Sequence, residues 1–152
     1  MSTLYNIDGS QSISIYLYKD IMSNEWIRYQ IVFENVRSCK SEKIIFNEET
    51  AETELFLECC IEPEIPRLLK DIYSLLEFQI SSSKFEPIDE KEFSLSATHI
   101  DNKIKVELTL RYRKCDYKIL MITNEKELLL FAKNLQIEYG DLVRGKHGLL
   151  KL

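Results

Sequence analysis

The side chains best suited to chemistry in this chain are four cysteines and two histidines, and their spacing argues against a metal site. They are Cys39, Cys59, Cys60, His99, Cys115 and His147. Cys59 and Cys60 are adjacent, and adjacent side chains of a strand point to opposite faces, so they cannot hold one ion together. The set contains no Cys-x-x-Cys pair and no zinc-finger spacing. We therefore expect no metal and no cofactor, with thiols that pack as small apolar groups.

A catalytic histidine is not indicated either. His99 ends an apolar strand face beside a turn, and Asp101 is the one notable polar residue near it in the sequence. A general base needs a nucleophile or an acid within hydrogen-bond reach. We predict no catalytic residues and no enzyme, and keep a metal-dependent enzyme built from acidic residues as the less favoured alternative.

Carboxylates are the most plentiful polar groups, and one cluster follows the first predicted helix. Glu86, Asp89, Glu90 and Glu92 fall within seven residues on the connection to the next strand. Solvated surface charge is the simpler interpretation. If the cluster has a role, binding of a basic partner is favoured over catalysis, because clustered acids attract a basic surface.

Aromatic side chains supply a second candidate contact set. Tyr16 and Tyr18 share one face of a predicted strand, and Trp26 and Arg28 belong to the next strand. Aromatic and arginine side chains often anchor interfaces. The same residues are equally consistent with packing under a helix, so both interpretations stay open.

The clearest structural pattern is the alternation of apolar and polar residues over positions 104–112. It predicts a strand with Ile104, Val106 and Leu108 on a dry face, and with Lys105 and Glu107 on a wet face. Arg111 continues the wet face and Arg113 follows it. This cationic pair could bind an anion, although solvation is the default interpretation.

Other patterns supply the remaining elements. Strands are predicted over residues 12–18, 25–34, 55–61, 93–99 and 117–122, and residues 44–46 could form a short one. Helices are predicted over residues 65–80, ending in the serines at 81–83, and over residues 124–139, with Asn124 and Glu127 as a capping box and Gly140 as the stop. We predict the α+β class, with a strongly curved antiparallel sheet of about five to seven strands and two amphipathic helices on one face.

Length and charge limit the class of protein. The chain has 152 residues and a net charge of −5, so we expect one domain over residues 1–152, with a core at about 12–139 and a short tail at 141–152. An acidic balance argues against nucleic acid as a partner. No signal-peptide pattern opens the chain and no apolar run approaches the ~20 residues that cross a bilayer. We expect a cytoplasmic protein with no membrane contact and with reduced thiols.

One family resemblance suggests a function. The chain contains a series of segments in a fixed order. They are Trp26-Ile27-Arg28-Tyr29-Gln30-Ile31-Val32-Phe33, the leucine-rich helix, Phe85-Glu86-Pro87, Phe93-Ser94-Leu95, the strand from Ile104, and Leu130-Phe131-Ala132. This order resembles the WapI-like immunity-protein family, over roughly residues 12 to 139. The resemblance implies a cytosolic protein that neutralises a cognate bacterial toxin, and such toxins are often basic nucleases. It carries over no interface residues.

The sequence therefore favours a toxin-neutralising immunity protein of contact-dependent inhibition. In that interpretation Glu86, Asp89, Glu90 and Glu92 meet a basic active site, and Tyr16, Tyr18 and Trp26 supply the desolvated centre. The expected partner is a protein toxin and not nucleic acid, and the expected state is a monomer or a weak homodimer. A structural or regulatory protein-binding module is the main alternative.

Overall fold

The fold consists of eight strands and two helices in the part of the chain that the structure describes. This structure is a computed structural model, and it describes residues 2–19, 26–37, 40–51, 64–86, 93–112 and 115–147. The strands are β1 (Ser2–Tyr5), β2 (Gln11–Lys19), β3 (Trp26–Arg37), β4 (Lys40–Ala51), β5 (Ser82–Phe85), β6 (Phe93–Ile100), β7 (Lys103–Tyr112) and β8 (Cys115–Thr123). The helices are α2 (Glu64–Leu76) and α3 (Glu125–His147).

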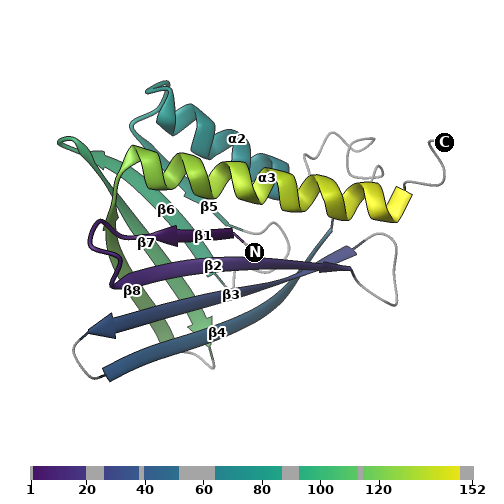
Figure 1. The fold of residues 1–152 in the computed structure, drawn as a ribbon, viewed down its shortest axis with the longest axis horizontal. Coiled ribbons are helices and arrows are strands. Elements are labelled where there is room, and N and C mark those ends of the chain that lie inside the picture. Colours follow the sequence, from purple (N-terminus) through teal and green to yellow (C-terminus); the bar gives the residue numbers. More distant parts are fainter. Residues whose placement is uncertain are drawn as a thin grey trace.

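The strands form two antiparallel sheets of four strands each. The first sheet has the order β1-β2-β3-β4 and the second has the order β5-β6-β7-β8. Each strand pairs with the next along the chain, so both sheets are meanders. Their strands run at a steep angle to one another (Figure 1).

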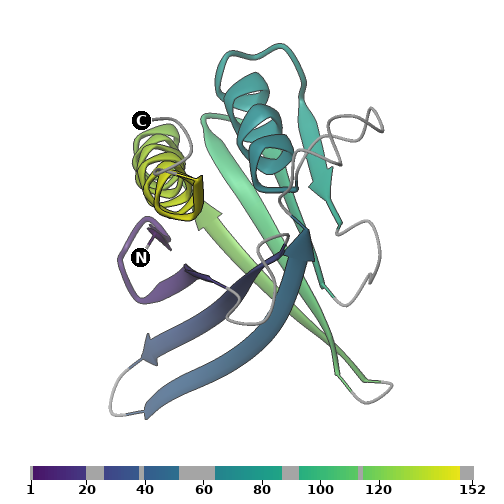
Figure 2. The ribbon, with the colours of Figure 1, turned by 90° about the vertical axis from the view of Figure 1, so that its right-hand side faces the viewer.

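The two helices lie on the inner side of the sheets, and Figure 2 shows α3 beside the first sheet and α2 beside the second. Buried apolar residues from both sheets and both helices form one continuous core. From α2 it takes Ile65, Leu68, Leu69, Ile72 and Leu75, and from α3 Leu128, Phe131, Ala132 and Leu135. Both stripes have the spacing that the sequence predicted, because residues three and four apart share one helix face.

The predicted α+β class is confirmed, with antiparallel strands and two amphipathic helices. The number of strands in the described residues is eight, above the expected five to seven, and they form two sheets instead of one. The short strands β1 and β5 were missed because four residues give too little alternation to detect. The segment at 44–46 is part of the twelve-residue strand β4. The strand predicted at 55–61 lies outside the described residues.

Helix α2 ends at Leu76, earlier than the apolar pattern predicted. Phe78 has a φ of 57°, in the left-handed region that ends helices. Its N–H donates to the carbonyl of Leu75 at 3.1 Å, and the N–H of Gln79 donates to the carbonyl of Ser74 at 2.9 Å. The pair forms a Schellman motif without the usual glycine. The Phe78 ring stacks on His99 with centroids 4.4 Å apart, a tertiary contact that sequence spacing does not reveal.

Helix α3 begins as predicted and continues past its predicted end. The Asn124 Oδ1 accepts the Glu127 N–H at 2.9 Å, so Asn124 is the N-cap. Gly140 does not stop the helix, which continues to His147. Leu142, beyond the glycine, packs against the core. That contact offsets the roughly 1 kcal/mol that glycine costs inside a helix.

Replacing the N-cap provides a test of the start of α3. We expect Asn124→Ala to lower the free energy of unfolding by about 1 kcal/mol, because the Glu127 N–H loses its acceptor. Chemical denaturation measures the change. Asn124→Ser is the control and should lose only a few tenths of a kcal/mol. Equal stability of the alanine variant and the wild type would show that the cap contributes nothing.

Glu138 of α3 ties the helix to the first sheet. Its two carboxylate oxygens accept the Ser2 hydroxyl and the Leu17 N–H, each at 2.9 Å. Because β1 begins at Ser2, which pairs with Ile15, the Leu17 N–H lies beyond the pairing with β1. The carboxylate therefore satisfies an edge donor that would otherwise lack a partner in the sheet.

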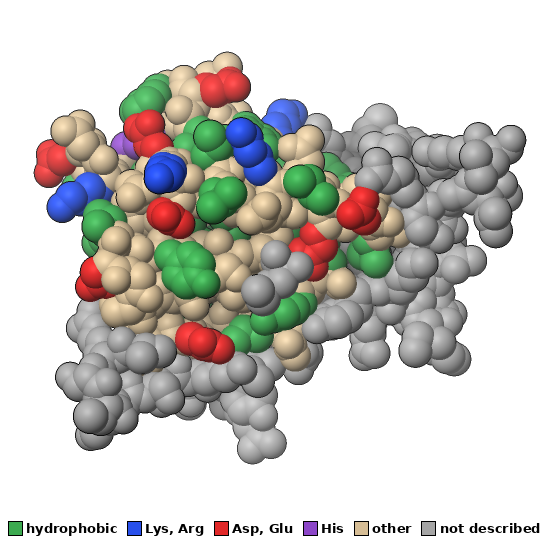
Figure 3. Space-filling model, viewed as in Figure 1, with side chains coloured by type: hydrophobic (Ala, Val, Ile, Leu, Met, Phe, Trp, Pro, Cys, Tyr) green, Lys and Arg blue, Asp and Glu red, His purple; other side chains and the backbone are tan. Residues whose placement is uncertain are grey.

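The side of the molecule that carries α3 has a mixed surface. Acidic, basic and apolar side chains are interspersed over it, with no gathering of one sign (Figure 3). In the part of the chain that the structure describes, no helix is long and apolar enough to cross a membrane.

Candidate functional site

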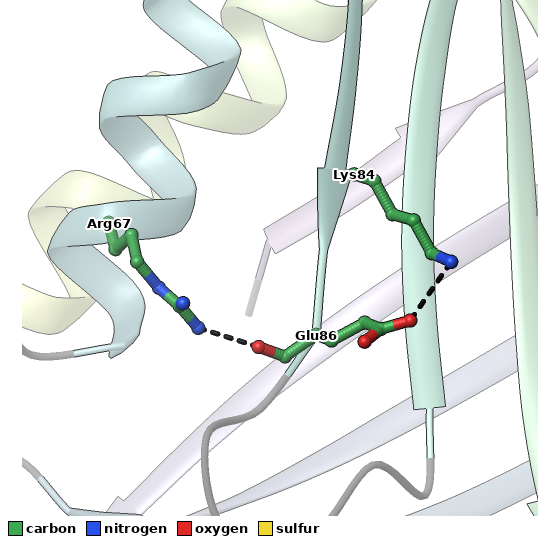
Figure 4. Close-up of polar contacts among 3 residues, drawn as sticks. All are labelled: Arg67, Lys84 and Glu86. Atoms are coloured by element: carbon green, nitrogen blue, oxygen red, sulfur yellow. Dashed lines mark hydrogen bonds and ion pairs between the residues drawn. The ribbon is translucent and has the colours of Figure 1, made fainter.

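Glu86, the first of the predicted acidic partner-binding residues, is held by local contacts. Its carboxylate pairs with the Lys84 ammonium at 3.0 Å, and its side chain is 25% exposed. The Arg67 guanidinium donates to the Glu86 carbonyl at 2.6 Å and lies 5.0 Å from the Phe85 ring centroid. Figure 4 shows Glu86 between the cations of α2 and β5. These contacts give Glu86 a role in joining α2 to β5.

The other predicted contact residues do not gather around Glu86 in the part that the structure describes. Asp89, Glu90 and Glu92 lie outside it. Tyr16, half-buried, and Tyr18 belong to β2 in the first sheet, whereas Glu86 follows β5 in the second. Register places Tyr16 opposite Gln30 and Tyr18 opposite Arg28. Trp26 opens β3, and the side chains of Tyr18 and Trp26 are not among those described.

A basic surface lies instead on the outer face of the second sheet. The inner face carries the core residues Leu95, Val106 and Met121, so the register fixes the outward residues. In successive rows these are Ile100 and Lys103; Ser82, Thr98, Lys105 and Ile122; Lys84, Ser96, Glu107 and Leu120; and Ser94, Thr109 and Lys118. We call this surface the lysine face. It includes the wet face predicted from the alternation at residues 104–112.

The lysine face has the opposite sign to the whole protein. Its described residues include four lysines, Lys84, Lys103, Lys105 and Lys118, against Glu107 and the neighbouring Glu86. The rest of the face is largely hydroxyl-bearing or aliphatic. Sequence reasoning singled out Lys105 and the arginines nearby but missed the set, because its members come from three strands and only their pairing brings them together.

One end of the lysine face adjoins the turn between β1 and β2. The Ile7 N–H donates to the Ile122 carbonyl at 3.0 Å, and the Thr123 hydroxyl donates to the Tyr5 carbonyl at 2.7 Å. These two bonds hold the turn against β8, beside which it lies in Figure 1. The junction joins the two sheets at a fixed position.

A pocket of about 440 Å³ opens at this junction. Leu120, Ile122 and Ile7 give it aliphatic surface, and they are 54%, 37% and 50% exposed. Lys103 of the lysine face also lines it. The volume is in the range of small-molecule sites.

The described residues offer no group of three or more His, Cys, Asp or Glu side chains that could hold a metal ion. Cys39, Cys59 and Cys60 lie outside the described residues, and Cys115 opens β8. The described residues do form a lysine-rich sheet surface with a pocket at one end.

Comparisons with known proteins find a shared fold and no sequence family. No family model matches the chain, and no curated protein sequence matches it significantly. The structure of the plant transcriptional regulator PBF-2 is similar, with a TM-score of 0.53 and 11% identity, over 98% of this chain and 84% of that one. The structure of MRP1/MRP2 of Trypanosoma bruciei has a TM-score of 0.43 and 8% identity, over 91% of this chain and 87% of that one. A guide-RNA-binding protein complex bound to a guide RNA also has a TM-score of 0.43, with 7% identity, over 84% of this chain and 89% of that one.

These similarities correct the expected partner, which was a protein toxin with nucleic acid excluded. The fold is shared with the plant transcriptional regulator PBF-2. The exclusion was wrong because it rested on the net charge of −5. Net charge averages over the whole surface, whereas a nucleic acid responds to the charge of the face that it contacts.

Proposed function

We propose that this protein binds single-stranded nucleic acid along the lysine face. The observation that carries the proposal is the segregation of charge: Lys84, Lys103, Lys105 and Lys118 gather on one sheet face of an acidic protein. Lysines on such a face neutralise phosphates and release counterions, which supplies most of the affinity in binding without sequence preference.

The shape of the face favours a single strand over a duplex. The lysine face belongs to a four-stranded sheet, whereas the elements that enter the major groove are a helix or a two-stranded ribbon. Sheet surfaces instead suit unpaired strands, whose backbone follows a basic track while the bases meet side chains. The serines and threonines between the lysines add hydroxyl groups that can donate to phosphate oxygens.

A titration with fluorescent oligonucleotides tests the proposal. We expect a 20-nucleotide single strand of thymidines or uridines to bind at 50 mM salt, and a duplex of equal length to bind at least about tenfold more weakly. Affinity should fall as salt rises, with a slope of about −0.7 for each phosphate contacted. The proposal would be refuted if neither the thymidine strand nor the uridine strand bound at 50 mM salt.

The toxin-neutralising function implied by the sequence resemblance stays a prediction, which the fold does not test. Its acidic contact set is represented in the described residues by Glu86 alone, which pairs with Lys84. The same binding assay bears on both functions. Salt-sensitive binding of oligonucleotides that is lost with the lysines supports the lysine face as the working surface.

A further inference from the structure

The pocket at the end of the lysine face differs in character from the face itself. The lysines offer charge to a phosphate chain, whereas Leu120, Ile122 and Ile7 offer aliphatic surface. Large aliphatic side chains exposed together at a pocket are unfavourable in water unless something covers them. They therefore mark a place where a ligand that follows the lysines could bury an apolar group.

The turn that forms one side of the pocket is already ordered. The Asn6 Oδ1 accepts the Gln11 N–H at 3.1 Å, and the Asn6 Nδ2 donates to the Gln11 Oε1 at 3.2 Å and to the Ser10 hydroxyl at 3.1 Å. The Asp8 carboxylate accepts the Ser10 N–H at 2.8 Å. A site built on such a turn needs little ordering when a ligand binds, which favours affinity.

The polar groups of the pocket suggest what it holds. Gln11 uses its Oε1 for Asn6, so its Nε2 hydrogens are the donors that it can offer a ligand. Lys103 supplies a cation, and Asp8 a carboxylate that repels phosphate. A planar group with carbonyl acceptors fits this donor, and a phosphate attached to it would lie toward Lys103 and the adjoining lysines.

We infer that the pocket receives one unstacked thymine or uracil base of a strand that lies on the lysine face. The inference rests on the proposed function. The base would place its ring against Leu120 and Ile122, and a carbonyl oxygen would accept from Gln11. Adenine carries an amino group in place of the exocyclic carbonyl, so it could accept from Gln11 only through a ring nitrogen.

The test compares two oligomers and two leucine variants. One oligomer is a 12-nucleotide thymidine strand, and the other has the same backbone with abasic sites throughout. Leu120→Ala removes aliphatic surface from the pocket, and Leu130→Ala on α3 is the matched control, since the two leucines are 54% and 51% exposed. Both substitutions are at exposed positions, so both proteins should fold.

We expect Leu120→Ala to weaken binding of the thymidine strand about five- to tenfold, because the base loses apolar contact. Binding of the abasic oligomer should change less than twofold, and the salt slope should stay unchanged because no phosphate contact is lost. Leu130→Ala should leave both affinities at the wild-type value.

Other outcomes separate the two proposals. Suppose that the wild-type protein binds the thymidine strand. If Leu120→Ala binds that strand with the same affinity, or lowers the affinity for both oligomers equally, the base pocket is refuted and the lysine face stands. If wild-type protein binds neither oligomer, both proposals fall. Methyl resonances of Ile7, Leu120 and Ile122 that shift with thymidine monophosphate, and not with ribose 5-phosphate, would support the pocket.

Discussion

Reversing three charges on the lysine face is expected to lower the affinity for a single-stranded oligonucleotide by about 100-fold or more at 50 mM salt. The variant carries Lys103→Glu, Lys105→Glu and Lys118→Glu, which lie on the adjacent strands β7 and β8. In the proposed mode of binding, each substitution removes a phosphate contact and adds a repelling carboxylate. The salt slope should become shallower by about 2, since each lost contact with a single strand contributes roughly 0.7.

A matched variant separates the local effect from the change in net charge. Lys70→Glu, Lys126→Glu and Lys133→Glu alter the net charge equally at exposed positions on α2 and α3. Binding to the lysine face predicts a loss of only a few-fold for this control, through long-range repulsion that salt screens. Equal losses in the two triple variants would contradict a localised site and would indicate that only the overall charge matters.

The sequence predicted the elements whose side chains have a strong period. The alternation over 104–112 and the apolar stripes of the two helices depend on one buried face each, and burial fixes their spacing. The sequence did not predict that α2 ends at Leu76, because the left-handed residue that follows, Phe78, stacks on His99, a contact between distant parts of the chain. The division into two sheets also depends on packing between distant segments, which no local pattern records.

Local sequence patterns predicted the candidate site even less well than the fold. Glu86 was selected for its acidic neighbours in the sequence, yet the structure pairs it with Lys84, two residues earlier. Lys118 and Lys105 are 13 positions apart in the sequence and belong to neighbouring strands only because β7 and β8 pair. Charge along the chain therefore indicated an acidic binder, whereas charge across the sheet indicates a basic face.

The buried stripe of α3 is expected to control stability without taking part in binding. Phe131 is 1% exposed, and Phe131→Ala should lower the free energy of unfolding by about 3–5 kcal/mol, because it removes buried apolar contacts and leaves a cavity. Its neighbour Leu130 is 51% exposed, so Leu130→Ala should cost less than about 1 kcal/mol in the same chemical denaturation.

Such a loss is a large share of the 5–15 kcal/mol that typically stabilises a domain, so Phe131→Ala should melt at a markedly lower temperature. Below that temperature it should still bind oligonucleotides with wild-type affinity. The reason is geometric: Phe131 belongs to the core against the inner faces of the sheets, whereas the lysines are on the outer face of the second sheet. Weaker binding by the folded variant would show that the lysine face depends on the packing of α3, and binding and stability would then be coupled through the sheet.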